Sequence, residues 1–362
     1  MKVVHHSFEG RFSDNPRALH EAMTVRRGAA DEHVWLADPV HRHGFPPEVT
    51  TVPFGSEEAL AALESADLVV SNTHLDLEWR KAPGAFYLQT WHGTPLKRIH
   101  HDVLFAPEGR LARLDRDVAR WDALVSPNAA STPLLRGAFG FDGPVLETGY
   151  PRNDVLLAPD APQRREKVRA QLGIADDVQA VLYAPTWRDD DVFGDGPAFA
   201  LRFDVERFAS RLGAESVLML RLHYLVSAAL AGTELPGVVD VSFHPDISDL
   251  YLAADVLVTD YSSSQFDVAV TGKPIVHHVH DLEHYRDTLR GFYFDFEEIA
   301  AGPLLRTSEE VLDALADLDA VQEAHRDRYA AFQERFCHLE DGRASDRVLD
   351  AVLPLVRGGE SR

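Results

Sequence analysis

Short apolar segments rich in β-branched residues alternate along this chain with longer segments of helical periodicity, and this alternation constrains the fold most strongly. Before residue 151 it predicts strands over residues 2–8, 33–38, 67–72, 85–91, 123–128 and 144–150. Between them it predicts helices over residues 15–23, 56–65 and 110–121. Such alternation is typical of parallel sheets whose faces are covered by helices.

The same pattern starts again after Pro151. It predicts strands over residues 178–187, 215–223, 238–243, 255–263 and 274–279, and helices over residues 204–213, 246–254 and 263–272. A chain of 362 residues is too long for one compact core. The sequence therefore predicts an α/β protein with two Rossmann-like domains, residues 1–150 and 151–362. The charged helical segment 309–355 is expected to pack back across the two domains.

Charge and composition narrow the class of function. The formal net charge of −22 argues against nucleic acid as a partner, although a local basic pocket is compatible with it. The single cysteine, Cys337, cannot form an intrachain disulfide, which favours a reducing cytoplasm. The first ten residues contain no apolar signal core, and no apolar run approaches the ~20 residues that span a bilayer.

Polar residues follow directly after many of the predicted strands. In the first half they occupy positions 6–7, 71–72, 91–94 and 126, and in the second half positions 185–188, 221, 223 and 260–264. Ligands of parallel α/β sheets bind at this end of the strands. The two sets predict a site between two domains, with a donor on one side and an acceptor on the other.

The segment VLVTDYSSSQFDVAVTGKP places a strand end at Asp260 and a helix start at residues 262–264. Serine is a good N-cap, and the free amides of a helix N-terminus bind phosphate. An ordinary capped helix without a ligand explains the segment equally well. Neither a P-loop nor G-x-G-x-x-G follows a strand, which disfavours a nucleoside triphosphatase and an NAD-dependent Rossmann enzyme.

Three basic residues in the second half are candidate phosphate contacts. Arg188 follows a predicted strand and has the fork geometry for phosphate, but a salt bridge with the acidic run 189–191 is the simpler alternative. Arg221 and His223 are two positions apart on a predicted strand, so their side chains are expected on the same face. A basic pair of this kind next to a diphosphate would offset charge on a leaving group.

The histidine pairs give little support for a metal. Adjacent histidines on a strand point to opposite faces, and three successive aspartates cannot all face one ion. No histidine has an H-E-x-x-H or Cys-x-x-Cys companion. We therefore expect neither a metal nor a cofactor.

Several motifs occur in a fixed order that resembles the CDP-glycerol glycerophosphotransferase family, the teichoic-acid glycerol- and ribitol-phosphate transferases. They are TWHGTPLK, YAPTWRD, LRLHYLV, DISDLYLAADVLVTDYSS and TGKPIVHHVHDLEHYRDTLRGFYFDFEE. The segments SFEGRFSDNPRALHEAM and TGYPRNDVLL also resemble that family, so the likeness covers nearly the whole chain. The resemblance implies a GT-B fold, in which two Rossmann-like domains face each other across a cleft and the C-terminal domain holds most of the nucleotide.

The resemblance also assigns residues to roles. It implies that His92 and His223 are the two essential histidines. It places donor and phosphate contacts on Thr186, Arg188, Arg221, Asp260, Ser262 and Ser263. On the acceptor side we expect Gly93, Thr94 and Lys97. His244 does not align with His223, and we expect it near the base or ribose of the nucleotide.

The implied reaction transfers glycerol phosphate or ribitol phosphate from a CDP-linked donor to a hydroxyl of a teichoic-acid-like or capsular acceptor and releases CMP. Our hypothesis makes His92 the base, because imidazole titrates near neutral pH. The two histidines could exchange roles. A GT-B glycosyltransferase that uses a nucleotide-sugar, and a non-catalytic scaffold that binds nucleotide or polymer, are the alternatives.

The resemblance further implies an acceptor linked to lipid or polyol phosphate, and peripheral contact with the inner face of the membrane. Residues 94–105, TPLKRIHHDVLF, are the best local candidate for that contact. The sequence does not distinguish glycerol from ribitol, nor a primase from a polymerase.

Overall fold

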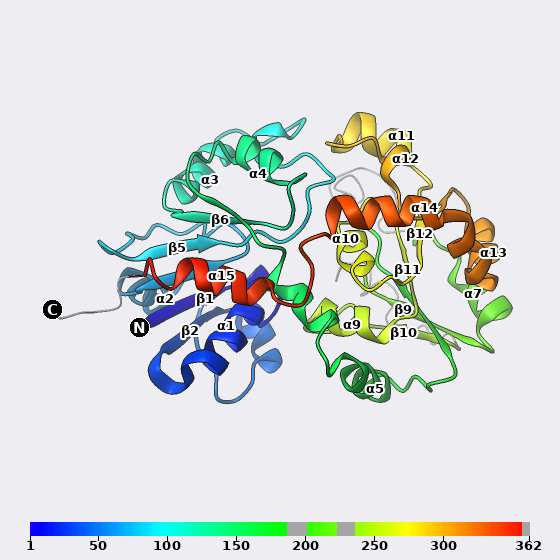
Figure 1. The fold of residues 1–362 in the computed structure, drawn as a ribbon, viewed down its shortest axis with the longest axis horizontal. Helices are drawn as coiled ribbons and strands as arrows, with labels where there is room; N and C mark the ends of the chain where they lie inside the picture. Colours follow the sequence, from blue (N-terminus) through cyan, green and yellow to red (C-terminus); the bar gives the residue numbers. More distant parts are fainter. Residues whose placement is uncertain (187–200, 223–235, 357–362) are drawn as a thin grey trace. The chain divides into compact units, whose positions relative to one another are not determined.

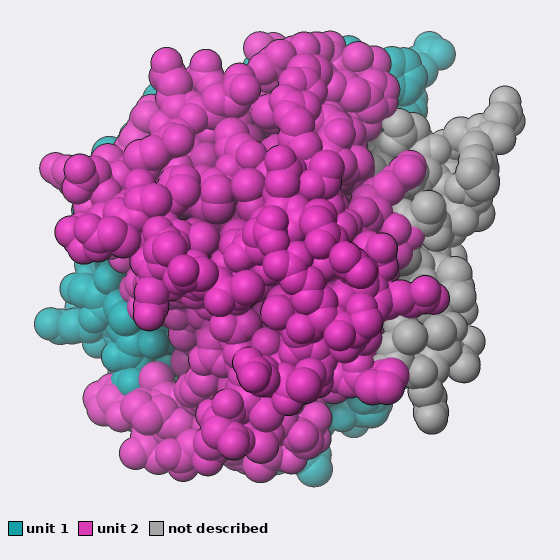
Figure 2. Space-filling view, turned by 90° about the vertical axis from the view of Figure 1, so that its right-hand side faces the viewer, with its two compact units in different colours: residues 1–94, 99–158, 338–362 teal, residues 95–98, 159–337 magenta. Residues whose placement is uncertain are grey.

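Figure 1 shows the fold as a computed structural model, which describes residues 1–186, 201–222 and 236–356. The chain divides into two compact units, drawn in teal and magenta in Figure 2. Unit 1 contains residues 1–94, 99–158 and 338–362, and unit 2 contains residues 95–98 and 159–337. The last described helix therefore belongs to unit 1 together with the N-terminal half of the chain.

Unit 1 is built on a parallel sheet with the strand order β3-β2-β1-β4-β5-β6-β7. Its strands are β1 (Lys2–His6), β2 (Glu32–Ala37), β3 (Thr50–Pro53), β4 (Leu68–Ser71), β5 (Phe86–Gln89), β6 (Ala123–Ser126) and β7 (Val145–Glu147). Its helices are α1 (Asp14–Arg27), α2 (Glu57–Glu64), α3 (Arg110–Val118), α4 (Thr132–Phe139) and α15 (Ala344–Val352). The short helices η1 (Phe8–Gly10) and η5 (Pro151–Leu156) lie in its loops.

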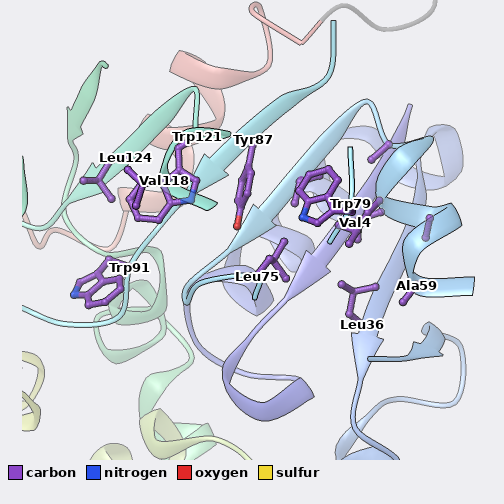
Figure 3. Packing of buried hydrophobic residues seen from close by; sticks show 14 of the residues in the cluster. Val4, Leu36, Ala59, Leu75, Trp79, Tyr87, Trp91, Val118, Trp121 and Leu124 are labelled. Carbon is purple, nitrogen blue, oxygen red and sulfur yellow. The ribbon is translucent and has the colours of Figure 1, made fainter. Parts of the chain in front are cut away.

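Both faces of the sheet in unit 1 are covered, which explains why central strands such as β4, with the sequence LVVS, are buried along their length. Neighbouring residues of β1 point to opposite faces, so Val3 and Val4 enter different apolar clusters. Val3 packs with Leu19 of α1 and Val348 of α15. Val4 packs on the other face with the cluster drawn in Figure 3, which extends from α2 to the aromatic residues near β5 and β6.

Unit 2 repeats this plan with a parallel sheet in the order β10-β9-β8-β11-β12-β13. The strands are β8 (Gln179–Tyr183), β9 (Ser216–Leu220), β10 (Val238–Asp240), β11 (Val256–Thr259), β12 (Ile275–His278) and β13 (Leu304–Leu305). The described helices are α5 (Ala161–Gln171), α7 (Val205–Leu212), α9 (Ile247–Ala253), α10 (Ser264–Ala269), α11 (Leu282–His284), α12 (Phe296–Ile299), α13 (Ser308–Ala316) and α14 (Leu318–Phe336).

The predicted α/β class with two parallel sheets is confirmed, and each predicted strand overlaps an observed one. The sequence prediction missed the edge strands β3 and β13 and the helices α4 and α5. The predicted strand 215–223 was too long, because β9 ends at Leu220. The helical segment 309–355 consists of three helices, α13, α14 and α15.

Local capping explains why that segment is interrupted. The Asp317 side chain accepts a hydrogen bond from the backbone N–H of Ala320 and so starts α14 directly after α13 ends. A second break separates α14 from α15, and there Gly342 adopts a positive φ of 79°.

Candidate active site

The chain makes a tight turn directly after β5, where the sequence predicted His92, Gly93 and Thr94 to act. The backbone N–H of Trp91 donates to the Gln89 side chain at 2.9 Å, and Trp91 has a positive φ of 53°. A non-glycine residue in this region costs about 1–3 kcal/mol and persists only where its surroundings enforce it. Trp91 is anchored in the apolar cluster of Figure 3, which holds this strained turn in place.

The His92 ring lies between aromatic neighbours and is fixed by one hydrogen bond. It stacks on Trp91 with ring centroids 4.0 Å apart and meets the edge of Phe8 at 4.6 Å. Its Nδ1 lies 2.5 Å from the backbone carbonyl oxygen of Asn72, at the end of β4. A carbonyl can only accept, so Nδ1 carries the proton and Nε2 holds the lone pair of the neutral ring.

The electrostatic surroundings keep His92 neutral. The pKa of His92 is lowered to about 4, chiefly by burial. Arg152 and His74 also lower this pKa, whereas the Asn72 carbonyl and Asp14 raise it. We expected a pKa close to neutrality from the residue type alone. The structure corrects this expectation, because desolvation of the packed ring outweighs the groups that favour its charged form.

Gly93 and Thr94 lie in the same turn, and both are buried. The Thr94 hydroxyl is 3.5 Å from the amide nitrogen of Asn128, which follows β6. Asn72, His92 and Asn128 therefore lie together at the carboxyl ends of the neighbouring strands β4, β5 and β6 in unit 1.

Lys97 belongs to a different unit from His92. Residues 95–98 group with unit 2, where Lys97 forms an isolated antiparallel bridge with Phe292. The backbone N–H of Arg98 donates to the Gly291 carbonyl at 3.1 Å, and Tyr293 donates to Leu96 at 2.9 Å. The chain thus passes from unit 1 to unit 2 between Thr94 and Pro95, and returns after Arg98.

The predicted donor contacts that the structure describes lie at the carboxyl ends of the strands in unit 2. Asp260, which follows β11, is buried and accepts a hydrogen bond from the backbone N–H of Thr186 at 2.8 Å. Thr186 follows the adjacent strand β8. The structure therefore brings into direct contact two predicted donor residues that are 74 positions apart in the sequence.

Ser262 and Ser263 precede the short helix α10. The Ser262 hydroxyl accepts from the backbone N–H of Ser264 at 3.3 Å and from the Ser264 hydroxyl at 3.0 Å. Ser263 is the N-cap residue by position, but its side chain makes no capping hydrogen bond. The serine that stabilises the start of the helix is thus Ser262.

Arg221 follows β9 and organises the loop after β10. Its Nη1 donates to the carbonyl oxygens of Val241, Ser242 and His244 at 2.7, 2.9 and 2.6 Å. The Nδ1 of His244 lies 3.0 Å from the Asp246 carbonyl oxygen. Arg221 and His244, which the sequence treated separately, are therefore directly linked. The predicted residues Arg188 and His223 lie outside the described residues.

Within the described residues, two groups of side chains have donor sets that suit a metal ion, and neither includes His92. One consists of His5, His20 and His33, and the other of His100, His101 and Asp115. In the second group both histidine Nε2 atoms contact one oxygen of Asp115, at 2.9 and 2.8 Å. These contacts already satisfy the pair as hydrogen bonds between histidine and carboxylate.

A pocket of about 470 Å³ lies in unit 2 at the start of β12, next to His325 and Tyr329 of α14. It lies at the opposite end of the sheet from Asp260, which follows the neighbouring parallel strand β11, and it contains none of the predicted site residues. No helix within the described residues is long and apolar enough to cross a bilayer.

Sequence reasoning missed four residues that hold the turn at residues 91–93: Asp14, Asn15, Tyr150 and Arg152. Their signal was present in the family-like segments SFEGRFSDNPRALHEAM and TGYPRNDVLL, to which no function was assigned. Asn72 was recognised only as one of several polar residues at strand ends.

The structure thus shows two parallel α/β units with polar residues at the carboxyl ends of their strands. A sequence model of the CDP-Glycerol:Poly(glycerophosphate) glycerophosphotransferase family matches residues 1–354, so the chain belongs to that family.

Known relatives agree over nearly the full length. The chain is 38% identical to a teichoic acid poly(glycerol phosphate) polymerase of Bacillus spizizenii, over 97% of this chain and 91% of the relative. It is 36% identical to a teichoic acid glycerol-phosphate transferase of Staphylococcus aureus, over 97% and 92%. A structure of the wall teichoic acid polymerase TagF soaked with CDPG superposes with a TM-score of 0.89, 35% identity and coverage of 98% and 89%.

Proposed function

We propose that this protein transfers glycerol phosphate from CDP-glycerol to a hydroxyl of a poly(glycerol phosphate) or lipid-linked acceptor and releases CMP. The proposal is supported by membership of the family and by relatives that act on glycerol phosphate. The observation that carries it is the neutral His92, whose Nδ1–H is committed to the Asn72 carbonyl and whose Nε2 is therefore a proton acceptor.

The proposed reaction is an attack of the acceptor oxygen on the glycerol-bearing phosphorus of the donor. The new bond joins the acceptor oxygen to that phosphorus, and the bond to the bridging oxygen of CMP breaks. Nε2 of His92 takes the hydroxyl proton, and CMP leaves with the bonding electron pair. General-base assistance of this kind contributes about 10²–10⁴-fold to the rate.

We assign the donor to unit 2, where Thr186, Asp260, Ser262 and Ser263 lie at the ends of β8 and β11. Thr186 and Asp260 are already joined by a hydrogen bond, which fixes the backbone on which a diphosphate would rest. Arg188, Arg221 and His223 complete the proposed donor site and would offset the charge that develops on CMP. No metal or cofactor takes part in this proposal.

We further propose a GT-B arrangement, with acceptor on unit 1 and donor on unit 2 across a cleft. The two parallel sheets of the separate units support it. Lys97 would supply a cationic contact to the anionic acceptor. It lies in the segment 95–98, which groups with unit 2 although it directly follows the His92 turn.

We propose that the protein is cytoplasmic and acts peripherally at the inner face of the membrane, because a lipid-linked acceptor is fixed there. Leu104 and Phe105 of unit 1 are 50% and 82% exposed, and the exposed arginines Arg110, Arg113 and Arg116 of α3 follow them. Apolar side chains beside basic ones suit an anionic lipid surface.

Vesicle flotation tests this membrane contact. Phe105→Ser should reduce binding to vesicles that contain phosphatidylglycerol. Val25→Ser is the matched control, because Val25 is 88% exposed on α1 of the same unit. Equal binding by wild type and Phe105→Ser would show that this segment does not make the membrane contact.

A donor panel tests the reaction itself. The purified protein is incubated with CDP-glycerol, CDP-ribitol or nucleotide-sugars together with a glycerol-phosphate-primed lipid acceptor. We expect CMP release with CDP-glycerol and a product heavier by whole glycerol-phosphate units. The number of units added separates a primase from a polymerase. Turnover of a nucleotide-sugar in place of CDP-glycerol would overturn the proposal.

A further inference from the structure

Three successive backbone carbonyls, at residues 91–93, accept hydrogen bonds from buried side chains of two distant segments. The Asn15 amide donates to the first at 3.0 Å, Arg152 Nη1 to the second at 2.6 Å, and the Tyr150 hydroxyl to the third at 3.1 Å. All three side chains belong to unit 1. Backbone carbonyls in a loop usually face water, so capture of three in a row is a specific restraint on this turn.

The donors are also joined to one another. Arg152 Nη1 contacts the Asp14 carboxylate at 2.7 Å, and the backbone N–H of Arg152 donates to the Asn15 side-chain oxygen at 3.0 Å. The side chains of Arg152 and Asp14 are 6% and 7% exposed, and Asn15 is fully buried. A buried ion pair that is also hydrogen-bonded on both sides has little freedom to move.

Both ends of this assembly hold strained backbone. Asp14 has a φ of 62° and Trp91 a φ of 53°, and neither is glycine. Backbone strain of this kind persists where surrounding contacts enforce it, and it concentrates at functional sites. Here the contacts that enforce the strained backbone converge on His92 and its two neighbours in the chain.

We propose that Asp14, Asn15 and Arg152 are positioning residues that hold the backbone at residues 91–93, and through it orient the His92 ring for proton transfer. This inference rests on the proposed function, in which His92 is the base. Arg152 is buried against Asp14 and the His92 carbonyl, so it acts through His92 rather than on the substrate. Asp14, Asn15 and Arg152 together form what we call the carbonyl clamp.

The clamp has a definite consequence for the ring. The Asn72 carbonyl can select the Nδ1–H form only while the turn keeps His92 at its present distance. If the backbone shifts, that hydrogen bond weakens and the ring samples the other tautomer, in which Nε2 carries the proton and cannot accept another. Misplacement of a reacting group by about 1 Å can cost about 10²-fold in rate.

The test combines kinetics of two clamp variants with a matched control. Arg152→Lys keeps the charge but cannot contact both Asp14 and the carbonyl with the same geometry. Asn15→Asp keeps the size and the acceptor for Arg152 but removes the donor to Trp91. Each variant should lose kcat by up to about 10²-fold with little change in KM for CDP-glycerol. Arg169→Lys changes a buried arginine of unit 2 that also binds carbonyls, and it should lower stability without lowering kcat.

A double-variant cycle shows whether the clamp acts through His92. In a His92→Ala background, Arg152→Lys should produce no further loss of kcat, because the group it positions is gone. An equal loss in both backgrounds would show that Arg152 has only a structural role, and would overturn the inference.

Histidine nitrogen-15 NMR of the unliganded protein provides a readout that does not depend on turnover. The His92 signal is assigned by its disappearance in His92→Gln. Wild type should show the Nδ1–H tautomer, and both clamp variants should show a mixture of tautomers. Wild-type protein that fails to release CMP would refute the proposed function while leaving this measurement valid. An unchanged tautomer in both folded variants would refute the clamp alone.

Discussion

Nδ1 of His92 lies 2.5 Å from the backbone carbonyl oxygen of Asn72, and this contact determines which ring nitrogen can accept a proton. The two residues follow neighbouring parallel strands, β5 and β4. Strand pairing therefore sets their separation, and the turn after β5 sets the direction of the ring.

The low pKa of His92 predicts an unusual pH profile. His92 must be neutral to accept a proton, so kcat/KM should rise with pH through about 4 and then stay level toward neutrality. An anionic donor raises the pKa of a nearby imidazole, so the acid limb of kcat should lie at higher pH than that of kcat/KM. Initial rates of CMP release give both profiles. Each acid sample is returned to neutral pH to check that activity recovers.

An acid limb of kcat/KM at the ordinary histidine pKa, about 6.5, would contradict this prediction. It would mean either that the ring is solvated in solution or that another group controls the profile.

Stability should fall in acid because buried histidines are neutral in the folded protein. Burial lowers the pKa of His277 to about 4, although its contact with Asp260 opposes the shift. The lowered folded pKa means that stability is complete above the unfolded pKa, near 6.5, and is lost as the pH falls toward 4. At about pH 5 this residue alone should cost about 2 kcal/mol of unfolding free energy.

Urea unfolding at neutral pH and near pH 5 measures the loss. His277→Gln should reduce the pH dependence by about that amount, whereas His43→Gln, at an exposed position, should leave it unchanged. The same pH dependence in wild type and His277→Gln would show that His277 is not responsible.

Gly10 should not tolerate a side chain. It has a φ of 72°, and a Cβ atom there would lie 2.1 Å from the backbone nitrogen of Asp38. Gly10→Ala should therefore displace η1, which carries Phe8 against His92, and should lower both the melting temperature and kcat. Gly28→Ala is the matched control, because Gly28 has a φ of 59° but open space around it. Similar losses in the two variants would mean that backbone strain, and not the steric clash, is the cause.

Arg169 should be essential for the stability of unit 2. It is 1% exposed, and its guanidinium donates to the carbonyls of Ala175, Val178 and Ala253. Arg169→Met would remove the donor from each of these buried contacts. It would also remove one of the two arginines that pair with Asp255. A buried carbonyl group that loses its hydrogen-bond donor costs about 1–3 kcal/mol. Differential scanning calorimetry should show the change, and an unchanged melting temperature would refute it.

The central strands could be predicted because strands covered on both faces are apolar throughout. Of the four edge strands, β7 and β10 were predicted, and β3 and β13 were not. β3 ends in a proline, and β13 has two residues. The break between α13 and α14 depends on one side-chain cap at Asp317, which a periodic apolar pattern does not reveal.

The sequence predicted that the candidate residues follow strands, and the structure confirms this position for His92 and Asp260. His92 was identified from its motif and its position after a strand, but its tautomer and its lowered pKa depend on packing against Phe8 and Trp91. Asn15 and Arg152 act on backbone carbonyls 76 and 60 positions away in the sequence. Every residue has a backbone carbonyl, so the residue type of the acceptor does not indicate such a contact in the sequence.

Replacement of His92 tests the account most directly. The measurement is the single-turnover rate of CMP release from CDP-glycerol, with a primed acceptor, for wild type, His92→Ala and the exposed control His101→Ala. We predict that His92→Ala remains folded and loses about 10²–10⁴-fold in rate, while His101→Ala keeps the wild-type rate. Near wild-type turnover by folded His92→Ala would contradict the assignment of His92 as the base.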